Sequence, residues 1–288
     1  MEEKMKKFIL WLTTLCMCVC IFNSVCYFAA QAAQKEYKIM VNRAANCVTV
    51  YEKDAFGAYS IPVKAFVCSC GREGHETPLG TYRTSNYYEW RLMVDGTYGH
   101  YAVRFNRGIM FHSVPYYTPN AGDLEWEQYN LLGEAVSLGC VRLASADVKW
   151  IYDNCKQGTE VTVYDDAQNS GPLGKPEEIK IAAENPYKTW DPTDTDANNP
   201  WNEIRPALHL MNERGDGIVY LPLGATQEDI YNALAIRTRE GVVYPKGEYE
   251  ISMTGDYDLN TAGTYVAHVC GTNAAGMRAE QDMLICVE

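Results

Sequence analysis

Two short segments carry residue types that together can form a cysteine nucleophile and its base. One is an apolar stretch that contains His112 and Ser113, and the other is a turn in which Gly139 precedes Cys140. The thiolate is the reactive form of cysteine, and a free thiol is only slightly ionised at neutral pH. An imidazole can take the thiol proton, and a group that accepts from its other ring nitrogen fixes the tautomer. The pair therefore predicts acyl transfer, with Cys140 as nucleophile and His112 as base.

The neighbours of Cys140 supply the other groups that this chemistry needs. Backbone N–H groups must stabilise a tetrahedral oxyanion, and those near Gly139 and Cys140 are the candidates. Gly139 allows a sharp turn and a close approach of the backbone. Arg142 is a fixed cation that can hold a carboxylate through two hydrogen bonds. This chemistry needs neither a metal nor another cofactor.

The elements that must position these residues are mainly β-strands. Runs of β-branched and aromatic residues bounded by Gly, Asn and Asp predict a β-rich domain with one helix. Apolar residues on one side of 144–154 predict that helix, with Ser145 as its N-cap. The predicted strands are Tyr37–Val41, Cys47–Tyr51, Lys64–Cys68, Gly80–Thr84, Tyr101–Phe105, Ile109–His112 and Glu160–Tyr164.

The second half of the chain predicts a linker followed by another β domain. Residues 167–201 are rich in Pro, Asp and Asn, a composition that is expected to stay extended and to bury no core. From residue 202 short strand patterns resume between Gly and Asp turns, which predicts a small β-sandwich. The strands expected there are Ile218–Leu221, Gly247–Ile251, Gly263–Cys270 and Met283–Val287.

The first 33 residues predict export from the cytoplasm. Three lysines precede the uncharged apolar run 8–30, and Ala30-Gln31-Ala32 resembles a cleavage site. The run is also long enough to span a bilayer, so a signal peptide and a retained membrane anchor both stay open. The net charge is −12 and no basic stripe occurs, which argues against nucleic acid as a partner. Contact with a membrane is expected only through this N-terminal segment.

Seven of the eleven cysteines lie after the export segment, and an odd number in an exported chain suggests one free thiol. We expect up to three disulfides beside it. Cys68 and Cys70 are predicted disulfide partners, with Cys47 or Cys155 as possible mates, and Cys270 could bridge to Cys286.

The segments around His112 and Cys140 resemble the catalytic domain of the YkuD-type L,D-transpeptidases. That family has a His followed by a small polar residue, and later a Ser/Thr-His-Gly-Cys stretch followed by a hydrophobic residue and Arg or Asn. His112-Ser113 and the stretch 137–142 match these motifs, and Thr77-Pro78-Leu79-Gly80-Thr81-Tyr82 resembles a further family strand. The resemblance covers about residues 37–165. One position departs from the pattern, because Leu138 stands where the family has His.

The resemblance implies a β-sandwich that acts on peptidoglycan stem peptides. Cys140 would attack the carbonyl at the L-centre of the third stem residue, and the terminal D-Ala would leave. His112 would act as base and then acid, and Ser113 would orient its ring. Arg142 and Ser137 would bind substrate, and carbapenem-type inhibitors would acylate Cys140. The long insert 116–135 could be a lid, or a surface loop with its own small cluster.

The C-terminal region, about residues 202–288, more weakly resembles bacterial Ig-like surface domains. The resemblance lies in Asp258–Tyr265, with its Gly-Thr-Tyr step, and in Asn273–Gly276. The predicted organisation is therefore a signal peptide or anchor at 1–33, a catalytic domain at 34–166, a linker at 167–201 and an Ig-like domain at 202–288. The predicted function is L,D-transpeptidation outside the cytoplasm, in the cell wall or secreted. Two alternatives are an L,D-carboxypeptidase that uses water as acceptor and a non-catalytic wall-adhesion protein.

Overall fold

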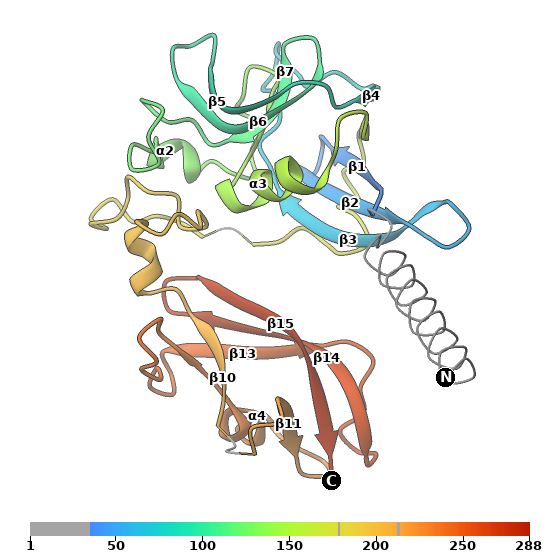
Figure 1. Cartoon of the computed structure of the whole chain (residues 1–288), viewed down its shortest axis with the longest axis vertical. Coiled ribbons are helices and arrows are strands. Elements are labelled where there is room, and N and C mark those ends of the chain that lie inside the picture. The colour runs from blue at the N-terminus through green and yellow to red at the C-terminus, as the bar shows by residue number, and fades with distance from the viewer. Residues whose placement is uncertain (1–34, 178, 212–213) are drawn as a thin grey trace, which may run out of the picture.

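The computed structural model describes residues 35–288 except 178 and 212–213, and two β-rich units lie one above the other (Figure 1). The predicted signal peptide or anchor at 1–33 lies outside the described residues. In the parts of the chain that the structure describes, no helix is long and apolar enough to cross a membrane. The mainly β architecture expected from the sequence is confirmed.

The first sheet of the N-terminal unit has the strand order β3-β2-β1-β9-β4. Its central strand β1 pairs antiparallel with β2 and parallel with β9. Alternate residues such as Ile39 and Val41 point into the core and are fully buried, as the period of two along a strand requires. The bounds are β1 Tyr37–Asn42, β2 Cys47–Lys53, β3 Tyr59–Val67, β4 Gly80–Arg83 and β9 Glu160–Tyr164.

The second sheet has the order β5-β6-β7-β8 and carries both residues of the predicted catalytic pair. Strand β7 pairs in parallel with β8, and His112 lies opposite Arg142 in that register. Helix α3, Ser145–Asn154, buries Val148 and Ile151 in the core that both sheets share. The bounds are β5 Tyr87–Leu92, β6 Tyr98–Asn106, β7 Ile109–Ser113 and β8 Val141–Leu143.

The predicted N-cap of α3 is wrong by one residue. Ala144 holds the cap position and has no side-chain oxygen, and Ser145 is the first helical residue. The Ser145 N–H instead donates to the carboxylate of Asp191 at 2.8 Å, and the Ala146 N–H donates to Thr193 Oγ1 at 3.0 Å. A carboxylate at this end satisfies a free N–H group and suits the helix dipole. The cap is therefore supplied by a distant segment.

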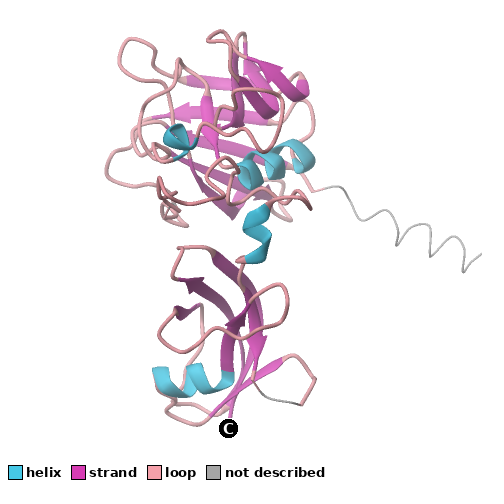
Figure 2. Ribbon diagram, turned by 90° about the vertical axis from the view of Figure 1, so that its left-hand side faces the viewer, coloured by secondary structure: helices cyan, strands magenta, loops and turns pink. Residues whose placement is uncertain are grey.

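The expectation that 167–201 stays extended and buries no core is wrong. Asp191 and Trp201 are almost fully buried, and Ile181 and Trp201 join one hydrophobic cluster with Tyr116 and Tyr129. The segment follows the surface of the N-terminal unit and ends in the helical turn η1, Pro200–Glu203, which lies between the two units (Figure 2). Asx turns explain its composition, because Asp and Asn side chains here bond backbone N–H groups two residues ahead.

The insert 116–135 is a packed surface element and contains the short helix α2, Trp126–Tyr129. Tyr116, Leu124 and Tyr129 are essentially inaccessible to solvent. The structure therefore favours the loop with its own cluster over the lid.

The C-terminal unit consists of two sheets and one helix. The larger sheet has the order β11-β15-β14-β13, in which β11 runs parallel to β15, and the smaller one pairs β10 with β12. Classification of this unit as Ig-like stays a prediction. The bounds are β10 Ala207–Leu210, β11 Ile218–Leu221, α4 Gln227–Ala233, β12 Leu234–Arg237, β13 Tyr249–Thr254, β14 Gly263–Asn273 and β15 Arg278–Val287.

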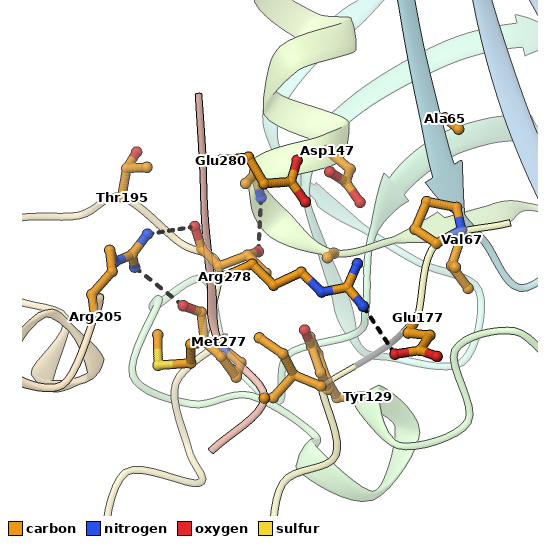
Figure 3. A pocket seen from close by; sticks show the side chains of 17 residues that line it. Ala65, Val67, Tyr129, Asp147, Glu177, Thr195, Arg205, Met277, Arg278 and Glu280 are labelled. Atoms are coloured by element: carbon orange, nitrogen blue, oxygen red, sulfur yellow. Dashed lines mark hydrogen bonds and ion pairs between the residues drawn. The ribbon is translucent and has the colours of Figure 1, made fainter. Parts of the chain in front are cut away.

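The turn between β14 and β15 connects the two units. Met277 is almost fully buried and packs in the same cluster as Val67, Tyr129 and Trp201. Beside it, the Arg278 guanidinium reaches the carboxylate of Glu177 at 3.0 Å, across a cleft of about 410 Å³ (Figure 3). Because the pair is exposed, the apolar contact of Met277 contributes more to this docking than the ion pair does.

The expected disulfides are not formed, since all seven cysteines of the described residues are free. Cys270 lies opposite Glu280 and Cys286 lies opposite Thr264, so the register separates the two cysteines by six residues along the strand. That is about 20 Å, far beyond the reach of a disulfide. The Cys68 and Cys70 sulfur atoms are 3.8 Å apart, which is a van der Waals contact without a bond.

Candidate active site

The strand pairing of β7 with β8 brings the two halves of the predicted site together. His112 is opposite Arg142, and Cys140 directly precedes β8. All three side chains line one cavity of about 310 Å³. The β5–β6 hairpin covers part of this cavity with Met93, Asp95 and other residues of its tip.

The His112 ring is held in the tautomer that suits a base. Its Nδ1 lies 2.6 Å from the backbone carbonyl of Ser113. A carbonyl can only accept, so Nδ1 carries the proton and Nε2 keeps its lone pair. The Gly99 backbone lies against the ring, because a Cβ there would be 2.8 Å from Nδ1. The ring is therefore fixed on two sides.

Ser113 orients the imidazole through its backbone carbonyl. Its hydroxyl has other partners: it donates to the Val114 carbonyl at 2.7 Å and accepts the His100 N–H at 2.9 Å. The side chain thus fastens β7 to β6 and fixes the position of the carbonyl that holds His112.

Electrostatics favour a neutral thiol and a neutral imidazole in the free protein. Burial, and next the positive charge of Arg142, lower the pKa of His112 to about 3. Burial raises the pKa of the Cys140 thiol, although a hydrogen bond from the Met110 backbone and the Arg142 charge act in the opposite direction. The thiol points to the Gly108 carbonyl at 3.8 Å. Proton transfer from Cys140 is therefore expected to accompany attack on the substrate rather than to precede it.

The turn that presents Cys140 depends on Gly139 and Ser137. Gly139 has φ of +115°, and a Cβ there would lie 2.8 Å from Ile109 Cδ1. Ser137 Oγ accepts the Gly139 N–H at 3.1 Å and donates to the Cys140 carbonyl at 2.5 Å. The buried Ser137 hydroxyl is thus occupied within the turn, where it has a positioning role. Because the Gly139 N–H is also occupied, the Cys140 N–H is the better candidate for the oxyanion hole.

The threonine of the Thr77-Pro78 motif supports the same turn from the other side. Thr77 is fully buried, and its hydroxyl donates to the Gly139 carbonyl at 2.9 Å while it accepts the Gly71 N–H at 2.9 Å. The resemblance singled out this motif, and the structure gives it a physical role.

Arg142 lines the cavity, and only part of its hydrogen-bonding capacity is used. Its Nη1 donates to Gln128 Oε1 at 2.9 Å, and its Nη2 is 3.9 Å from Asp95 Oδ2. Its Nε is buried and has no hydrogen-bond partner in the described part of the chain. A buried guanidinium with an unused N–H group suits an anionic group of a ligand.

Asp95, Glu125 and Gln128 line a cavity together with Arg142, and none of the three was predicted from the sequence. Asp95 had a signal, because Asp95-Gly96 is the turn chemistry of a hairpin and could have placed this tip between two strands. Glu125 and Gln128 lie in the insert, where no pattern indicates which side chains face the site.

Asp194 was also missed, and it lies close to His100 on strand β6. Its Oδ2 is 4.0 Å from His100 Nδ1, and both atoms are buried without a hydrogen-bond partner among the described residues. The His100 ring stacks between Trp90 and Tyr101, at centroid distances of 3.9 and 3.7 Å. Since the His100 N–H bonds Ser113, this pair supports the residue that holds His112.

Comparison with known proteins gives one family match for this chain. A sequence profile described as the L,D-transpeptidase catalytic domain, YkuD, matches residues 36–163. No curated protein sequence matches the chain.

Among solved structures, one match is an L,D-transpeptidase from Mycobacterium smegmatis, at 21% identity and a TM-score of 0.37, over 45% of this chain and 59% of that one. Another is from Mycobacterium tuberculosis H37Rv, at 26% identity and a TM-score of 0.36, over 46% and 58%. A third is L,D-transpeptidase 3 from Mycobacterium tuberculosis with a faropenem-derived adduct, at 24% identity and a TM-score of 0.36, over 46% and 61%. The chain thus spans about three fifths of the length of these structures. By the profile match, residues 36–163 of this chain are similar to the L,D-transpeptidase catalytic domain, YkuD.

Proposed function

We propose that the protein is a cell-wall L,D-transpeptidase that forms peptidoglycan cross-links through an acyl-enzyme on Cys140. The observation that carries the proposal is one cavity lined by Cys140, Arg142 and a His112 ring whose Nδ1 is fixed by the Ser113 carbonyl. This leaves His112 Nε2 as the proton acceptor for the thiol. The family match of residues 36–163 supports the same reaction class.

The first half of the reaction forms the thioester. Cys140 Sγ attacks the carbonyl carbon at the L-centre of the third stem residue while His112 Nε2 takes the thiol proton. The Cys140 N–H stabilises the oxyanion. His112 then returns the proton to the departing amine of the terminal D-Ala, and the C–N bond breaks.

The second half transfers the acyl group to an amine of another stem. The amine nitrogen attacks the thioester carbonyl, its proton passes to His112, and the C–S bond breaks as the thiolate regains that proton. Water in place of the amine gives the carboxypeptidase reaction. The proposal places the protein outside the cytoplasm, because its substrate is there and residues 1–33 have the composition of a signal peptide or membrane anchor.

The test is the intact mass of the purified protein after exposure to imipenem, beside a Cys140→Ala variant. We expect one covalent adduct on the wild-type protein and none on the variant, as for an activated cysteine in an acyl-transfer site. A structural comparison supports the choice of probe, since one matched L,D-transpeptidase carries a faropenem-derived adduct. A folded wild-type protein without an adduct would remove the catalytic proposal and favour the adhesion alternative.

A further inference from the structure

The hairpin between β2 and β3 projects from the N-terminal unit and carries an aromatic side chain at its tip (Figure 1). Phe56 is 97% exposed, more than any other large apolar side chain of the described residues. Its neighbours Ala55, Gly57 and Ala58 are exposed as well. A single exposed apolar residue is common on protein surfaces, so its meaning depends on how the tip is built and where it lies.

Hydrogen bonds hold the backbone of the tip in one shape. Asp54 Oδ1 accepts the N–H groups of Phe56 and Ala58, both at 2.9 Å. The Asp54 N–H donates to the Ala58 carbonyl at 2.7 Å, and Ser60 Oγ donates to Asp54 Oδ2 at 2.6 Å. Because the loop is already ordered, contact of the Phe56 ring with an apolar partner costs little additional entropy.

The tip lies at the end of the sheet where the chain enters β1. Strand β1 runs antiparallel to β2, and the Lys53 N–H donates to the Glu36 carbonyl at 3.1 Å. Lys35 is therefore level with the first residue of the tip. The uncharged apolar run 8–30 ends five residues earlier in the sequence, which is at most about 18 Å of extended chain. A bilayer that held this run would thus lie within reach of the tip.

Lysines surround this end of the sheet and balance its acidic residues. Lys35 pairs with Glu52, and Lys53 and Lys156 both pair with Glu36. The net charge of the whole chain is −12, so an end without an acidic excess is the part that an anionic lipid surface repels least. Lysine stems can also extend along an apolar surface and keep their ammonium groups among lipid headgroups.

We infer that the β2–β3 tip is a membrane-contact site, in which Phe56 enters the lipid–water interface beside a retained N-terminal anchor. Interfaces of this kind stabilise aromatic side chains whose backbone stays in the polar layer. The inference goes beyond the proposed function, and it adds a second contact to the one expected from residues 1–33. Two contacts fix which side of the catalytic unit faces the bilayer, whereas one attachment point would leave the unit free to rotate.

The test introduces a photoreactive residue at the tip of the full chain, as Phe56→p-benzoylphenylalanine. The protein is reconstituted in vesicles that contain phosphatidylcholine and phosphatidylglycerol in equal parts, and it is then irradiated. Mass spectrometry of the digested protein identifies peptides that carry a lipid. We expect a lipid adduct on the peptide that contains position 56.

A matched control carries the same photoreactive residue as Val94→p-benzoylphenylalanine. Val94 is 94% exposed and also lies in a hairpin loop, between β5 and β6, but the inference gives this loop no membrane contact. We expect no lipid adduct there. Both positions are exposed, so circular dichroism should show that both variants fold like the wild type.

A lipid adduct at neither position, or equal yields at both, would overturn the inference. A second measurement tests the anchor, because the intact mass of the protein extracted from its host membranes should include residues 1–33. A mass without them would also overturn it. Failure of the proposed function looks different, since imipenem would then leave no adduct on Cys140 whatever the lipid result.

Discussion

Replacement of Asp191 by alanine should destabilise the catalytic unit, although this residue lies outside the segment that matches the family. The carboxylate is fully buried and accepts three hydrogen bonds. They come from the Ser145 N–H at 2.8 Å, from the Thr193 N–H at 2.7 Å and from Thr193 Oγ1 at 2.6 Å. Asp191→Ala leaves the helix α3 N-terminus without this cap and the buried donors without a partner.

The expected loss of unfolding free energy in Asp191→Ala follows from these contacts. Loss of an N-cap costs roughly 0.5–2 kcal/mol. A buried donor without a partner costs about 1–3 kcal/mol more. We therefore expect the free energy of unfolding to fall by about 3 kcal/mol. For a protein of this size that corresponds to a fall of roughly 6–12 °C in melting temperature.

Asp191→Asn should behave differently. Burial raises the pKa of Asp191, so the site disfavours the charge itself and the useful part is the oxygen acceptor. Asparagine keeps one acceptor oxygen, but its NH2 group would face one of the two backbone donors that the carboxylate oxygens accept, so its effect should be about 1–2 kcal/mol, smaller than that of alanine. Glu184→Ala serves as a control, because Glu184 is an exposed acidic residue of the same segment. The measurement is thermal unfolding followed by circular dichroism. A fall of less than 2 °C for Asp191→Ala, or equal falls for alanine and asparagine, would refute the reasoning.

Four further outcomes follow from the structure. Because burial raises its pKa, the Cys140 thiol should react slowly with iodoacetamide at pH 7 and faster above pH 9; a rate that is already at its plateau below pH 7 would contradict this. Gly139→Ala should abolish the imipenem adduct in a folded protein, since φ is +115° and the new methyl group would lie 2.8 Å from Ile109 Cδ1; retained acylation would show that the turn can adapt. Burial raises the pKa of Asp194 to about 6, so the stability that its protonated form contributes is lost as pH rises from about 4 through 6. The melting temperature of Asp194→Asn relative to the wild type should therefore increase between pH 4 and pH 7, and a constant difference would disprove the shift. Met277→Ala should lower the free energy of unfolding by about 2–5 kcal/mol as measured in urea, because it empties a buried position between the two units; no change would mean that they do not support each other.

The sequence predicted the site residues best where both the chemical motif and the strand pattern lie within a short stretch of the chain. His112 and Cys140 lie on or next to apolar runs with a period of two, and two adjacent strands can bring them to one cavity. The role of Gly139 could be predicted, because a sharp turn before Cys140 needs a residue that tolerates a positive φ. The residues that surround Arg142 could not be predicted, since Asp95 and Glu125 come from separate loops that only the tertiary fold brings together.

The composition of the segment 167–201 led to the wrong prediction of an extended linker without a buried core. Its prolines and acidic residues are typical of a linker, but Asx turns make the same residues compact, and Asp191 is buried by its bonds to α3. The cysteine count misled too, because an odd number predicts neither a pairing nor its geometry. The register of β14 with β15 keeps Cys270 and Cys286 apart, and register cannot be read from spacing.

The position of Asp191 and Asp194 in the sequence, after all strands of the N-terminal unit, affects the order in which the protein folds during synthesis. Every strand of the two catalytic sheets has been synthesised once residue 164 is made, His112 and Cys140 included. The carboxylate that caps α3 and the one that faces His100 are added about 30 residues later. During synthesis from the N-terminus, all strands of both sheets are therefore present before the carboxylates of Asp191 and Asp194, which support the site. The nucleophile should reach its final geometry only after this later stretch has docked, which delays reactivity until most of the polypeptide has been made.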